Sequence, residues 1–178
     1  MKFLFRALAV ACALLTHPLA TDATPTARSS APATLTGEVA YNPHNPFARI
    51  IRGELPAYKV YEDAHVLAFL SLDQSAPGHV LVISKTSKAQ NILEMSPQDL
   101  VRVMLVAQRI ARAEVKTLHA DGVVIRQNNG AAGGQTVFHL HVHVVPHWQD
   151  APPEFARNAD GKLDRTAMAA RIAAAMGR

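Results

Sequence analysis

Short apolar runs separated by polar turns predict the strands of a sheet. Residues 58–62 and 66–70 are rich in strand-forming residues, and the polar connection at Asp63 predicts a hairpin between them. Residues 80–85 form a continuous apolar run, which is typical of a central strand. Residues 123–127 predict a further strand after a turn. The pattern therefore indicates a sheet assembled from segments that are spread along the chain.

A last strand is predicted in the stretch that ends at Pro146, where three histidines occupy alternate positions. The histidines are His139, His141 and His143. The residues beside them are apolar: Phe138, Leu140, Val142 and Val144. Because successive side chains of a strand point to opposite faces, we expect one face in the core and a row of imidazoles on the other. Pro146 is expected to end the strand, since proline cannot donate to the ladder.

Helical patterns flank these strands. Residues 45–53 begin with an asparagine that can cap and a proline that suits the first turn, and they end at a glycine. Residues 96–118 begin in the same manner with Ser96 and Pro97, and their apolar residues recur at helical spacing. Residues 163–176 are alanine-rich and predict a short helix, whose docking position the sequence leaves open. Strands and helices together support the α+β class.

The composition is that of a globular protein with a mild basic excess. The chain has 178 residues, of which 49% are hydrophobic and 18% are charged, and its formal net charge is +4. This length suits one domain with tails. The excess charge suits an anionic ligand, but it is too small and too scattered to indicate a nucleic-acid partner. A generally basic soluble protein fits the charge equally well.

Residues 1–23 predict a signal peptide. Two basic residues give a positive start, and residues 7–15 form an apolar run that suits a secretory leader and is too short to span a bilayer. Small residues allow cleavage after Ala23. The mature protein is then expected to be secreted or periplasmic, without contact with the membrane. An uncleaved anchor, or lipidation at the single cysteine, Cys12, is the alternative.

Residues 24–44 predict a flexible linker, because they are rich in Ala, Thr, Ser and Pro and contain few large apolar residues. The folded domain is expected over residues 45–148, followed by a C-terminal tail over residues 149–178 that includes the short helix. Removal of the leader would remove Cys12, which leaves no cysteine for a disulfide, a thiol nucleophile or a cysteine-based zinc site.

The histidine row allows three interpretations. The first is chance alternation of polar residues on a half-exposed strand. The second is a metal site, but residues four apart on a strand lie ~13 Å apart, so one zinc would reach two of the three histidines more easily than all three. The third is a nucleophilic imidazole beside a glycine-rich loop that binds an anion, and we favour it because of its sequence context.

Three stretches resemble the histidine triad family. The signature of this family is three histidines separated by single apolar residues, with two apolar residues after the third histidine. Residues 139–145 fit this signature, and residues 133–137 are similar to the family's lead-in. Residues 76–79 (Ala-Pro-Gly-His) and residues 50–56 (Ile-Ile-Arg-Gly-Glu-Leu-Pro) are similar to two further family blocks. The matches occur in the family's order and cover most of residues 45–148.

The resemblance implies an antiparallel sheet of about five strands with one long helix packed on it, and a homodimer. It implies a hydrolase of nucleoside phosphoryl compounds, such as phosphoramidates, dinucleoside polyphosphates or adenylated small molecules. His141 would be the nucleophile and form a covalent nucleotidyl-histidine. This chemistry demands neither a metal nor another cofactor.

The resemblance also implies a set of supporting residues. His139 is expected to orient the neighbouring imidazole, His79 to accompany the triad, and Asn128 to contact the substrate. The remaining residues are expected to donate hydrogen bonds to phosphate oxygens, through side chains or loop amides: His143, Gln135, Thr136, Gly133 and Gly134. Either Thr136 or His143 is a candidate for placing a proton near the leaving group.

Two departures from the family pattern affect the prediction. Ser71 stands where relatives usually have an aspartate that binds ribose hydroxyls, and Asp73 is the nearest substitute. Asn45 and Ala48 stand where many relatives have the cysteines of a zinc site, so a structural zinc is not expected there. The alternative function is a non-catalytic nucleotide- or metal-binding module on the same fold.

Overall fold

The structure is a computed structural model that describes residues 40–152 and 164–177. Both stretches belong to one compact unit, Thr34–Arg178. The predicted signal peptide, most of the predicted linker and part of the C-terminal tail lie outside the described residues, so these assignments stay predictions. Among the helices of the described residues, none is long and apolar enough to cross a membrane.

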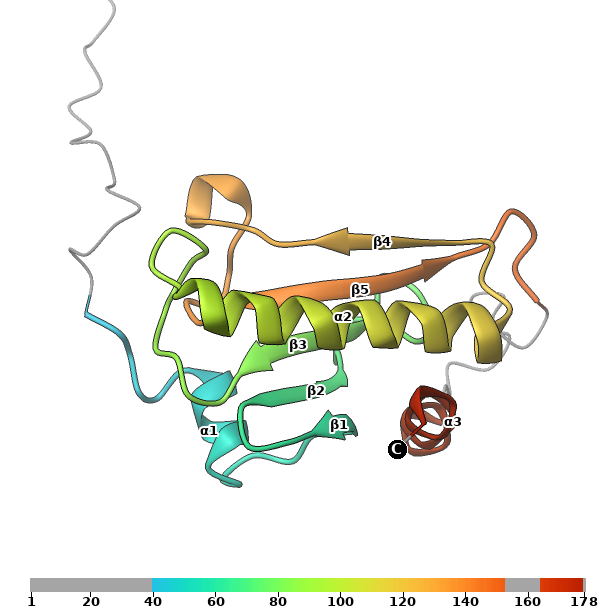
Figure 1. Ribbon diagram of the computed structural model, residues 1–178, viewed down its shortest axis with the longest axis horizontal. Coiled ribbons are helices and arrows are strands. Elements are labelled where there is room, and N and C mark those ends of the chain that lie inside the picture. The colour runs from blue at the N-terminus through green and yellow to red at the C-terminus, as the bar shows by residue number, and fades with distance from the viewer. Residues whose placement is uncertain (1–39, 153–163, 178) are drawn as a thin grey trace, which may run out of the picture. The chain divides into compact units, whose positions relative to one another are not determined.

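The described residues contain an antiparallel sheet of five strands, which confirms the predicted α+β fold (Figure 1). In chain order the strands are β1 (Lys59–Glu62), β2 (Val66–Leu70), β3 (Val80–Ser84), β4 (Gly122–Arg126) and β5 (His141–His147). Their order across the sheet is β1-β2-β3-β5-β4. The strand that carries His141 and His143 is therefore interior, between β3 and the edge strand β4.

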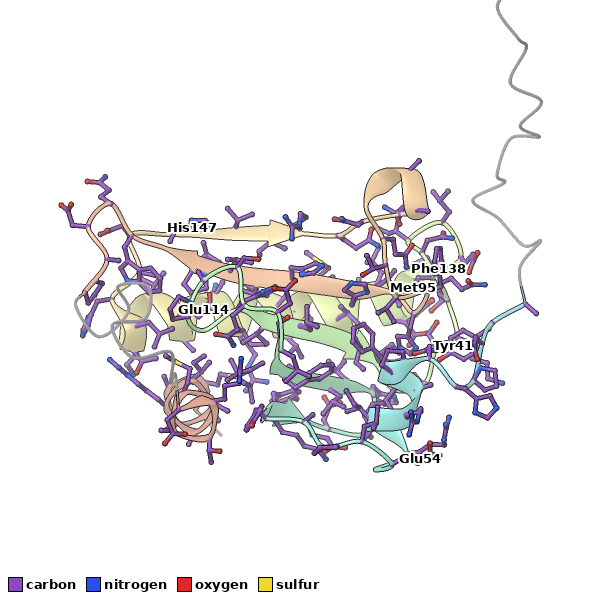
Figure 2. All side chains as sticks on the ribbon, turned by 180° about the vertical axis from the view of Figure 1, so that it is seen from behind. Tyr41, Glu54, Met95, Glu114, Phe138 and His147 are labelled. Carbon is purple, nitrogen blue, oxygen red and sulfur yellow. The ribbon has the colours of Figure 1, made fainter. Side chains whose placement is uncertain are left out.

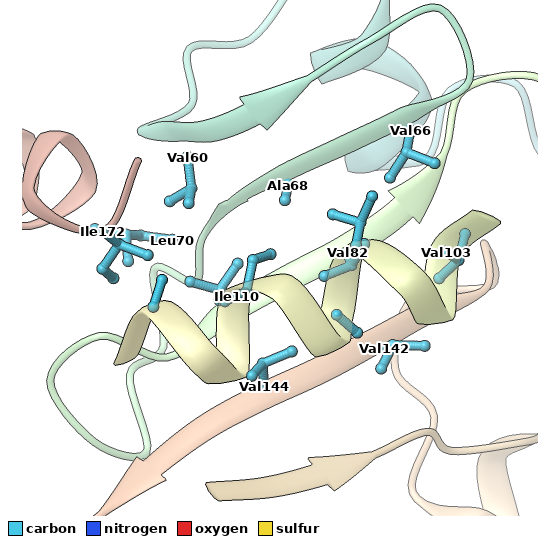
Figure 3. Close-up of a cluster of buried hydrophobic side chains, with 14 of the residues drawn as sticks. Val60, Val66, Ala68, Leu70, Val82, Val103, Ile110, Val142, Val144 and Ile172 are labelled. Atoms are coloured by element: carbon cyan, nitrogen blue, oxygen red, sulfur yellow. The ribbon is translucent and has the colours of Figure 1, made fainter. Parts of the chain in front are cut away.

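Helix α2 (Pro97–Leu118) lies across one face of the sheet (Figure 3). As predicted, Ser96 caps it, because the Ser96 hydroxyl accepts a hydrogen bond from the amide of Asp99 at 3.1 Å. The residues buried between helix and strands are mostly aliphatic: Val66, Ala68, Leu70, Val80, Val82, Val103, Ile110, Val142 and Val144. Because every second strand residue faces α2, the intervening residues face the opposite side of the sheet.

Helix α1 (Pro46–Ile51) covers part of that opposite face. The Asn45 side chain accepts a hydrogen bond from the amide of Ala48 at 2.9 Å, so Asn45 serves as the N-cap of α1. A second, smaller core lies against this helix and consists of Phe47, Leu67, Phe69, Leu81 and Ile83. The same packing places the Phe47 ring beside the histidines of β5.

Helix α3 (Arg165–Met176) packs against α2, a position that the sequence did not predict. Asp164 caps the helix by accepting a hydrogen bond from the amide of Ala167 at 3.0 Å. Ile172 is fully buried in the core between the sheet and α2. The guanidinium of Arg171 donates a hydrogen bond to the main-chain oxygen of Thr117, near the end of α2.

The histidine strand differs from its prediction at both ends. Strand β5 begins at His141, so His139 precedes it and does not belong to the ladder, and Phe138 is 41% exposed instead of buried. The strand also continues through Pro146, which pairs with Val123. Pairing with β3 stops at Val144, so the missing amide of Pro146 removes no bond to β3.

Candidate active site

A pocket of about 630 Å³ opens on the sheet face that carries α1. Eight of the predicted site residues line it: Ser71, Asp73, His79, Asn128, Gly134, Thr136, His141 and His143. These residues come from the β2–β3 loop, the loop after β4 and strand β5, which the antiparallel pairing brings together. The remaining predicted site residues, His139, Gln135 and Gly133, lie behind the pocket wall or in the adjoining loop.

His141 is the first residue of β5, and its ring is fixed from two sides. Its Nδ1 atom lies 2.8 Å from the main-chain oxygen of His139. A carbonyl oxygen can only accept, so Nδ1 carries the ring proton of the neutral imidazole and Nε2 keeps its lone pair. The Phe47 ring stands edge-on to the imidazole, with 5.0 Å between the ring centroids. Among the described residues, Nε2 has no hydrogen-bond partner, so it is free for a ligand in the pocket.

The electrostatics of the site keep His141 neutral. Burial lowers the pKa of its imidazole below the ordinary value of 6.5, because burial disfavours the charged form. The positive charge of Arg126 lowers that pKa further. At neutral pH the ring is therefore an uncharged nitrogen base, which is the form able to act as a nucleophile.

His139 is a buried anchor behind the pocket. Its Nε2 atom lies 3.1 Å from the main-chain oxygen of Ser84, and its Nδ1 atom lies 2.7 Å from the hydroxyl of Tyr41. Nε2 therefore donates to Ser84, and Nδ1 accepts from Tyr41. Burial lowers the pKa of His139 to about 4. His139 thus contacts His141 through its main chain, and its imidazole serves to hold that main chain in place.

His79 and His143 form a second pair of imidazoles. The Nε2 atom of His79 lies 2.9 Å from Nδ1 of His143, so one ring donates to the other. The Nδ1 atom of His79 lies 3.2 Å from the main-chain oxygen of Asp73. The pKa of His143 is lowered to about 3, first by burial and then by the nearby His141, His79 and Arg126. The pair links the β2–β3 loop to β5 and stays neutral at pH 7.

The glycine-rich loop uses most of its polar groups internally. It contains a short 3-10 turn, η1 (Ala131–Gly133), and the amides of Gly133 and Gly134 donate to main-chain oxygens within the loop. Gln135 is buried, and its side-chain amide donates to the main-chain oxygens of Gln90 at 2.5 Å and Val137 at 3.0 Å. This corrects the expectation that these groups donate to phosphate, because their hydrogens already have acceptors.

Gly134 brings the loop close to Asn128. Its φ is +82°, which side chains rarely adopt, and a Cβ at this position would lie 2.9 Å from the Asn128 side-chain nitrogen. Asn128 and the exposed Thr136 both line the pocket. Thr136 therefore remains available to a phosphate, whereas the loop mainly sets the position of Asn128.

The β2–β3 loop separates the roles of Ser71 and Asp73. The Ser71 hydroxyl is buried and donates to the main-chain oxygen of Asp73 at 2.8 Å. The Asp73 side chain is exposed at the pocket and forms no ion pair among the described residues. Gly78, in the same loop, has a φ of +91°, and a Cβ there would lie 2.6 Å from Leu118 Cδ1. Close packing against the core thus fixes the loop that carries His79.

Two polar residues of the site were missed by sequence reasoning, as were the apolar residues of the pocket such as Phe47. Tyr41, whose hydroxyl binds His139, lies in the segment that leads into α1 (Figure 2), and this segment was predicted to be a linker. Arg126 is the last residue of β4, pairs in register with His143 and lines the pocket. The local sequence predicts neither contact, because the Tyr41 contact joins two distant non-strand segments and the Arg126 contact depends on β4 pairing with β5.

Within the described residues, no three His, Cys, Asp or Glu side chains are grouped so that they could hold a metal ion. The Tyr41 and Ser84 contacts occupy both nitrogens of His139, which separates it from the other histidines. The geometry leaves Nε2 of His141 and Nε2 of His143 without a hydrogen-bond partner among the described residues, in a pocket lined by polar groups at one side.

A family model described as the HIT domain matches residues 52–150. The chain belongs to the histidine triad (HIT) family. Its described residues have the fold of this family, which is a fold of the nucleotide-binding, hydrolase type. The match covers every strand, the glycine-rich loop and all three triad histidines.

Relatives in several bacteria share this fold. The protein hit of Bacillus subtilis (strain 168) is 41% identical over 102 residues, which cover 57% of this chain and 70% of that protein. A Hit-like protein involved in cell-cycle regulation from Bartonella henselae, solved with an unknown ligand, matches with a TM-score of 0.66 at 39% identity, over 76% of this chain and 99% of the other. A zinc-bound histidine triad family protein from Mycobacterium smegmatis matches with a TM-score of 0.62 at 38% identity, over 73% of this chain and 91% of the other.

Proposed function

We propose that this protein hydrolyses nucleoside phosphoryl compounds through a covalent nucleotidyl intermediate on His141. The observation that carries the proposal is the 2.8 Å contact between His141 Nδ1 and the main-chain oxygen of His139. This contact fixes the ring proton on Nδ1 and leaves the Nε2 lone pair free in a pocket. A fixed, neutral imidazole is a suitable nucleophile for a phosphorus atom.

In the first step, Nε2 of His141 attacks the α-phosphorus. The Nε2–P bond forms and the bond to the leaving group breaks, with the electron pair departing on the leaving group. Both ring nitrogens are then substituted, so the imidazole carries a positive charge. The main-chain oxygen of His139 stabilises this charge through the Nδ1 hydrogen.

In the second step, a water molecule attacks the same phosphorus. The Nε2–P bond breaks and its electron pair returns to the ring, which becomes neutral again. The water gives one proton to the solvent, and the nucleoside monophosphate leaves.

The shape and chemistry of the pocket support a nucleotide as the substrate. Phe47, Ile50, Leu55, Phe69 and Leu81 form an apolar wall that suits a flat base. Asp73 is the carboxylate available to ribose hydroxyls, whereas the Ser71 hydroxyl already donates within the loop. The Thr136 hydroxyl is placed to donate to phosphate oxygens. Because Nδ1 of His79 donates to the main-chain oxygen of Asp73, Nδ1 of His143 donates to Nε2 of His79, and Nε2 of the neutral His143 ring is an acceptor.

We further propose that the protein is a homodimer that pairs through β4 and α2. β4 is an edge strand, and Val124 and Ile125 on it are 47% and 43% exposed. A groove of about 420 Å³ lies between β4 and α2 and is lined by Val115, Val123 and Ile125 among others. An exposed apolar edge strand is a template for pairing, and a second copy of the same edge fits it by two-fold symmetry.

Export of the mature protein also stays a proposal, because it rests on the residues before Ala23. Its test is recovery of the full-length product expressed in a Gram-negative host, followed by N-terminal sequencing. A periplasmic protein that begins at Thr24 supports export, whereas a cytoplasmic protein with an intact N-terminus opposes it.

The hydrolase proposal is tested with adenosine 5′-phosphoramidate and with diadenosine triphosphate as substrates. We expect AMP release by the wild-type protein, its loss in His141→Ala, and an AMP adduct on His141 in acid-quenched samples analysed by mass spectrometry. His44→Ala removes an exposed histidine outside the pocket and serves as the matched control. Equal inertness of the wild-type and His141→Ala proteins on both compounds contradicts the proposal.

A non-catalytic nucleotide- or metal-binding module is the alternative function. The zinc-bound relative from Mycobacterium smegmatis favours a test for metal. Metal analysis of the purified protein, before and after dialysis against a chelator, measures bound zinc per chain. One tightly held ion per chain in a protein without AMP-releasing activity supports the alternative.

A further inference from the structure

Arg126 is a charged pocket residue to which the proposed steps at His141 assign no contact with the substrate. It lies at the end of β4, opposite His143 in the register, and its side chain lines the same pocket. Arg126 is an exposed residue, and its guanidinium forms no ion pair with an acidic side chain of the described residues. A guanidinium is always charged and binds anionic oxygens with two donors. An uncompensated one in a pocket is therefore a site for an anion.

The pocket has two chemically different ends, with His141 and His143 between them. The apolar wall lies near α1, which covers the sheet on the side of β1 to β3. Arg126 and Asn128 lie on the side of β4, the opposite edge of the sheet (Figure 1). A base bound against the apolar wall places the reacting phosphorus near the histidines. The group beyond that phosphorus then extends towards Arg126.

We propose that Arg126 binds an anionic leaving group, so that nucleoside phosphoanhydrides are the preferred substrates over nucleoside phosphoramidates. This inference rests on the proposed nucleotidyl transfer to His141 and names its leaving group. Arg126 is then a specificity-determining residue, because it contacts the part of the substrate that differs between the two classes.

The two substrate classes differ in the charge that develops on the departing atom. In a phosphoanhydride, the bridging oxygen leaves with the electron pair of the broken P–O bond and becomes part of an anionic phosphate. The Arg126 guanidinium stabilises that charge as it forms. In a phosphoramidate, the nitrogen takes up a proton from the solvent and leaves as a neutral amine, to which a guanidinium gives no electrostatic stabilisation.

The kinetic test compares two substrates that share the adenylyl group. Diadenosine triphosphate releases ADP, and adenosine 5′-phosphoramidate releases ammonia. We expect Arg126→Gln to lower kcat/KM for the first by about 10- to 100-fold, the range of a lost charge-assisted hydrogen bond, and for the second by less than about twofold. Arg126→Lys is expected to recover part of the loss. Arg102→Gln removes the same charge from α2, where Arg102 pairs with Asp99 at 3.1 Å, and should change neither value.

A binding test separates this inference from the hydrolase proposal. AMP and α,β-methylene-ADP are titrated into the wild-type protein and into Arg126→Gln, since the methylene compound carries an anionic group in the leaving position and is not cleaved there. We expect the wild-type protein to prefer the methylene compound by about tenfold or more, and the variant to lose that preference.

The outcomes are distinguishable. A preference that depends on Arg126, in a protein that turns over neither substrate, supports the anion site and contradicts the hydrolase. Turnover by wild type, lost in His141→Ala, with equal effects of Arg126→Gln on both substrates, supports the hydrolase and overturns the role of Arg126. An unchanged preference for the methylene compound in Arg126→Gln also overturns that role.

Discussion

The main-chain oxygen of His139 accepts a hydrogen bond from Nδ1 of His141 at 2.8 Å. This contact exists because β5 begins at His141, which leaves the carbonyl of His139 outside the sheet ladder and free to turn towards the ring. If the strand began before His139, the carbonyl of His139 would point to a neighbouring strand and would not be free to accept from the His141 ring. Because the ladder starts at His141 and does not include His139, the carbonyl of His139 determines which nitrogen of His141 faces the pocket.

The activity should withstand mild acid. The pKa of His141 is lowered, first by burial and then by Arg126, so its Nε2 lone pair is lost only at a pH below 6.5. We expect kcat/KM for adenosine 5′-phosphoramidate to stay level from pH 8 to 6.5 and to fall at lower pH. In Arg126→Gln the acidic fall should move to higher pH, because a positive charge beside the ring has been removed. A wild-type acidic limb centred above pH 6.5 would contradict this account.

Tyr41 should stabilise the site from a segment that precedes α1. Its hydroxyl lies 2.7 Å from Nδ1 of the buried His139, and Tyr41→Phe leaves that nitrogen without its donor. We expect the free energy of unfolding to fall by about 1–2 kcal/mol, measured by urea denaturation at pH 7. Tyr58→Phe removes an exposed hydroxyl for which the structure gives no hydrogen bond, and is expected to have no effect. Equal effects of both substitutions would mean that the Tyr41 contact is not formed.

Two neighbouring glycines should respond differently to alanine. Gly134 has a φ of +82°, and a Cβ there would lie 2.9 Å from Asn128 Nδ2, so Gly134→Ala must displace Asn128 or strain the loop. A Cβ at Gly133 has nothing within 4 Å. We expect Gly134→Ala to raise KM for both adenylyl substrates several-fold and Gly133→Ala to leave it within about twofold. The reverse order of effects would place the substrate on the other side of the loop.

The local sequence predicted the elements of this fold well. Asn45 with Pro46 and Ser96 with Pro97 are cap signals that act within one helical turn, and α1 and α2 begin where these signals predict. The apolar runs of β2 and β3 were equally clear, because both faces of these strands are buried. Such signals depend on near neighbours and need no knowledge of the tertiary fold.

The parts that sequence reasoning missed depend on contacts between distant segments. Arg126 joins the site only because β4 pairs with β5 in a register that sets it opposite His143. Gln135 does not donate to the expected phosphate site, because its side-chain amide donates to the main-chain oxygen of Gln90, 45 positions away. Pro146 remains in β5 because pairing with β3 stops at Val144, so no bond to β3 is lost. Contacts between segments far apart in the sequence decided each case.

The proposed dimer should be sensitive to charge at β4. Ile125 is 43% exposed and lines the groove between β4 and α2, so Ile125→Glu would bury a carboxylate in the interface. We expect a dimer for the wild-type protein and a monomer for this variant in size-exclusion chromatography with light scattering. Leu93→Glu, at an exposed leucine outside the groove, should remain dimeric. Circular dichroism shows whether each variant is folded, and a wild-type monomer at micromolar concentration would contradict the proposal.

Glu114 should make the protein less stable as pH rises. It lies on α2, fully buried (Figure 2 labels it), and neither side-chain oxygen has a hydrogen-bond partner among the described residues. Burial raises its pKa from 4.5 to about 8. Between these values the folded chain keeps a proton that the unfolded chain releases, so the free energy of unfolding decreases as pH rises from about 4.5 to about 8.

Glu114→Gln should remove this loss without changing the shape of the side chain. Relative to the wild type, we expect little difference at pH 4.5 and a gain in the free energy of unfolding on the order of 3–5 kcal/mol at pH 8. Urea denaturation of both proteins at the two pH values measures the difference, and Glu114→Met tests whether an apolar chain of similar length gains more. The contrary outcome is a glutamine variant whose free energy of unfolding, compared with that of the wild type, is lower at pH 8 than at pH 4.5. Such a result would mean that the carboxylate is ionised and paired in the folded protein. The buried carboxyl group would then be a stabilising contact, and the raised pKa would be wrong.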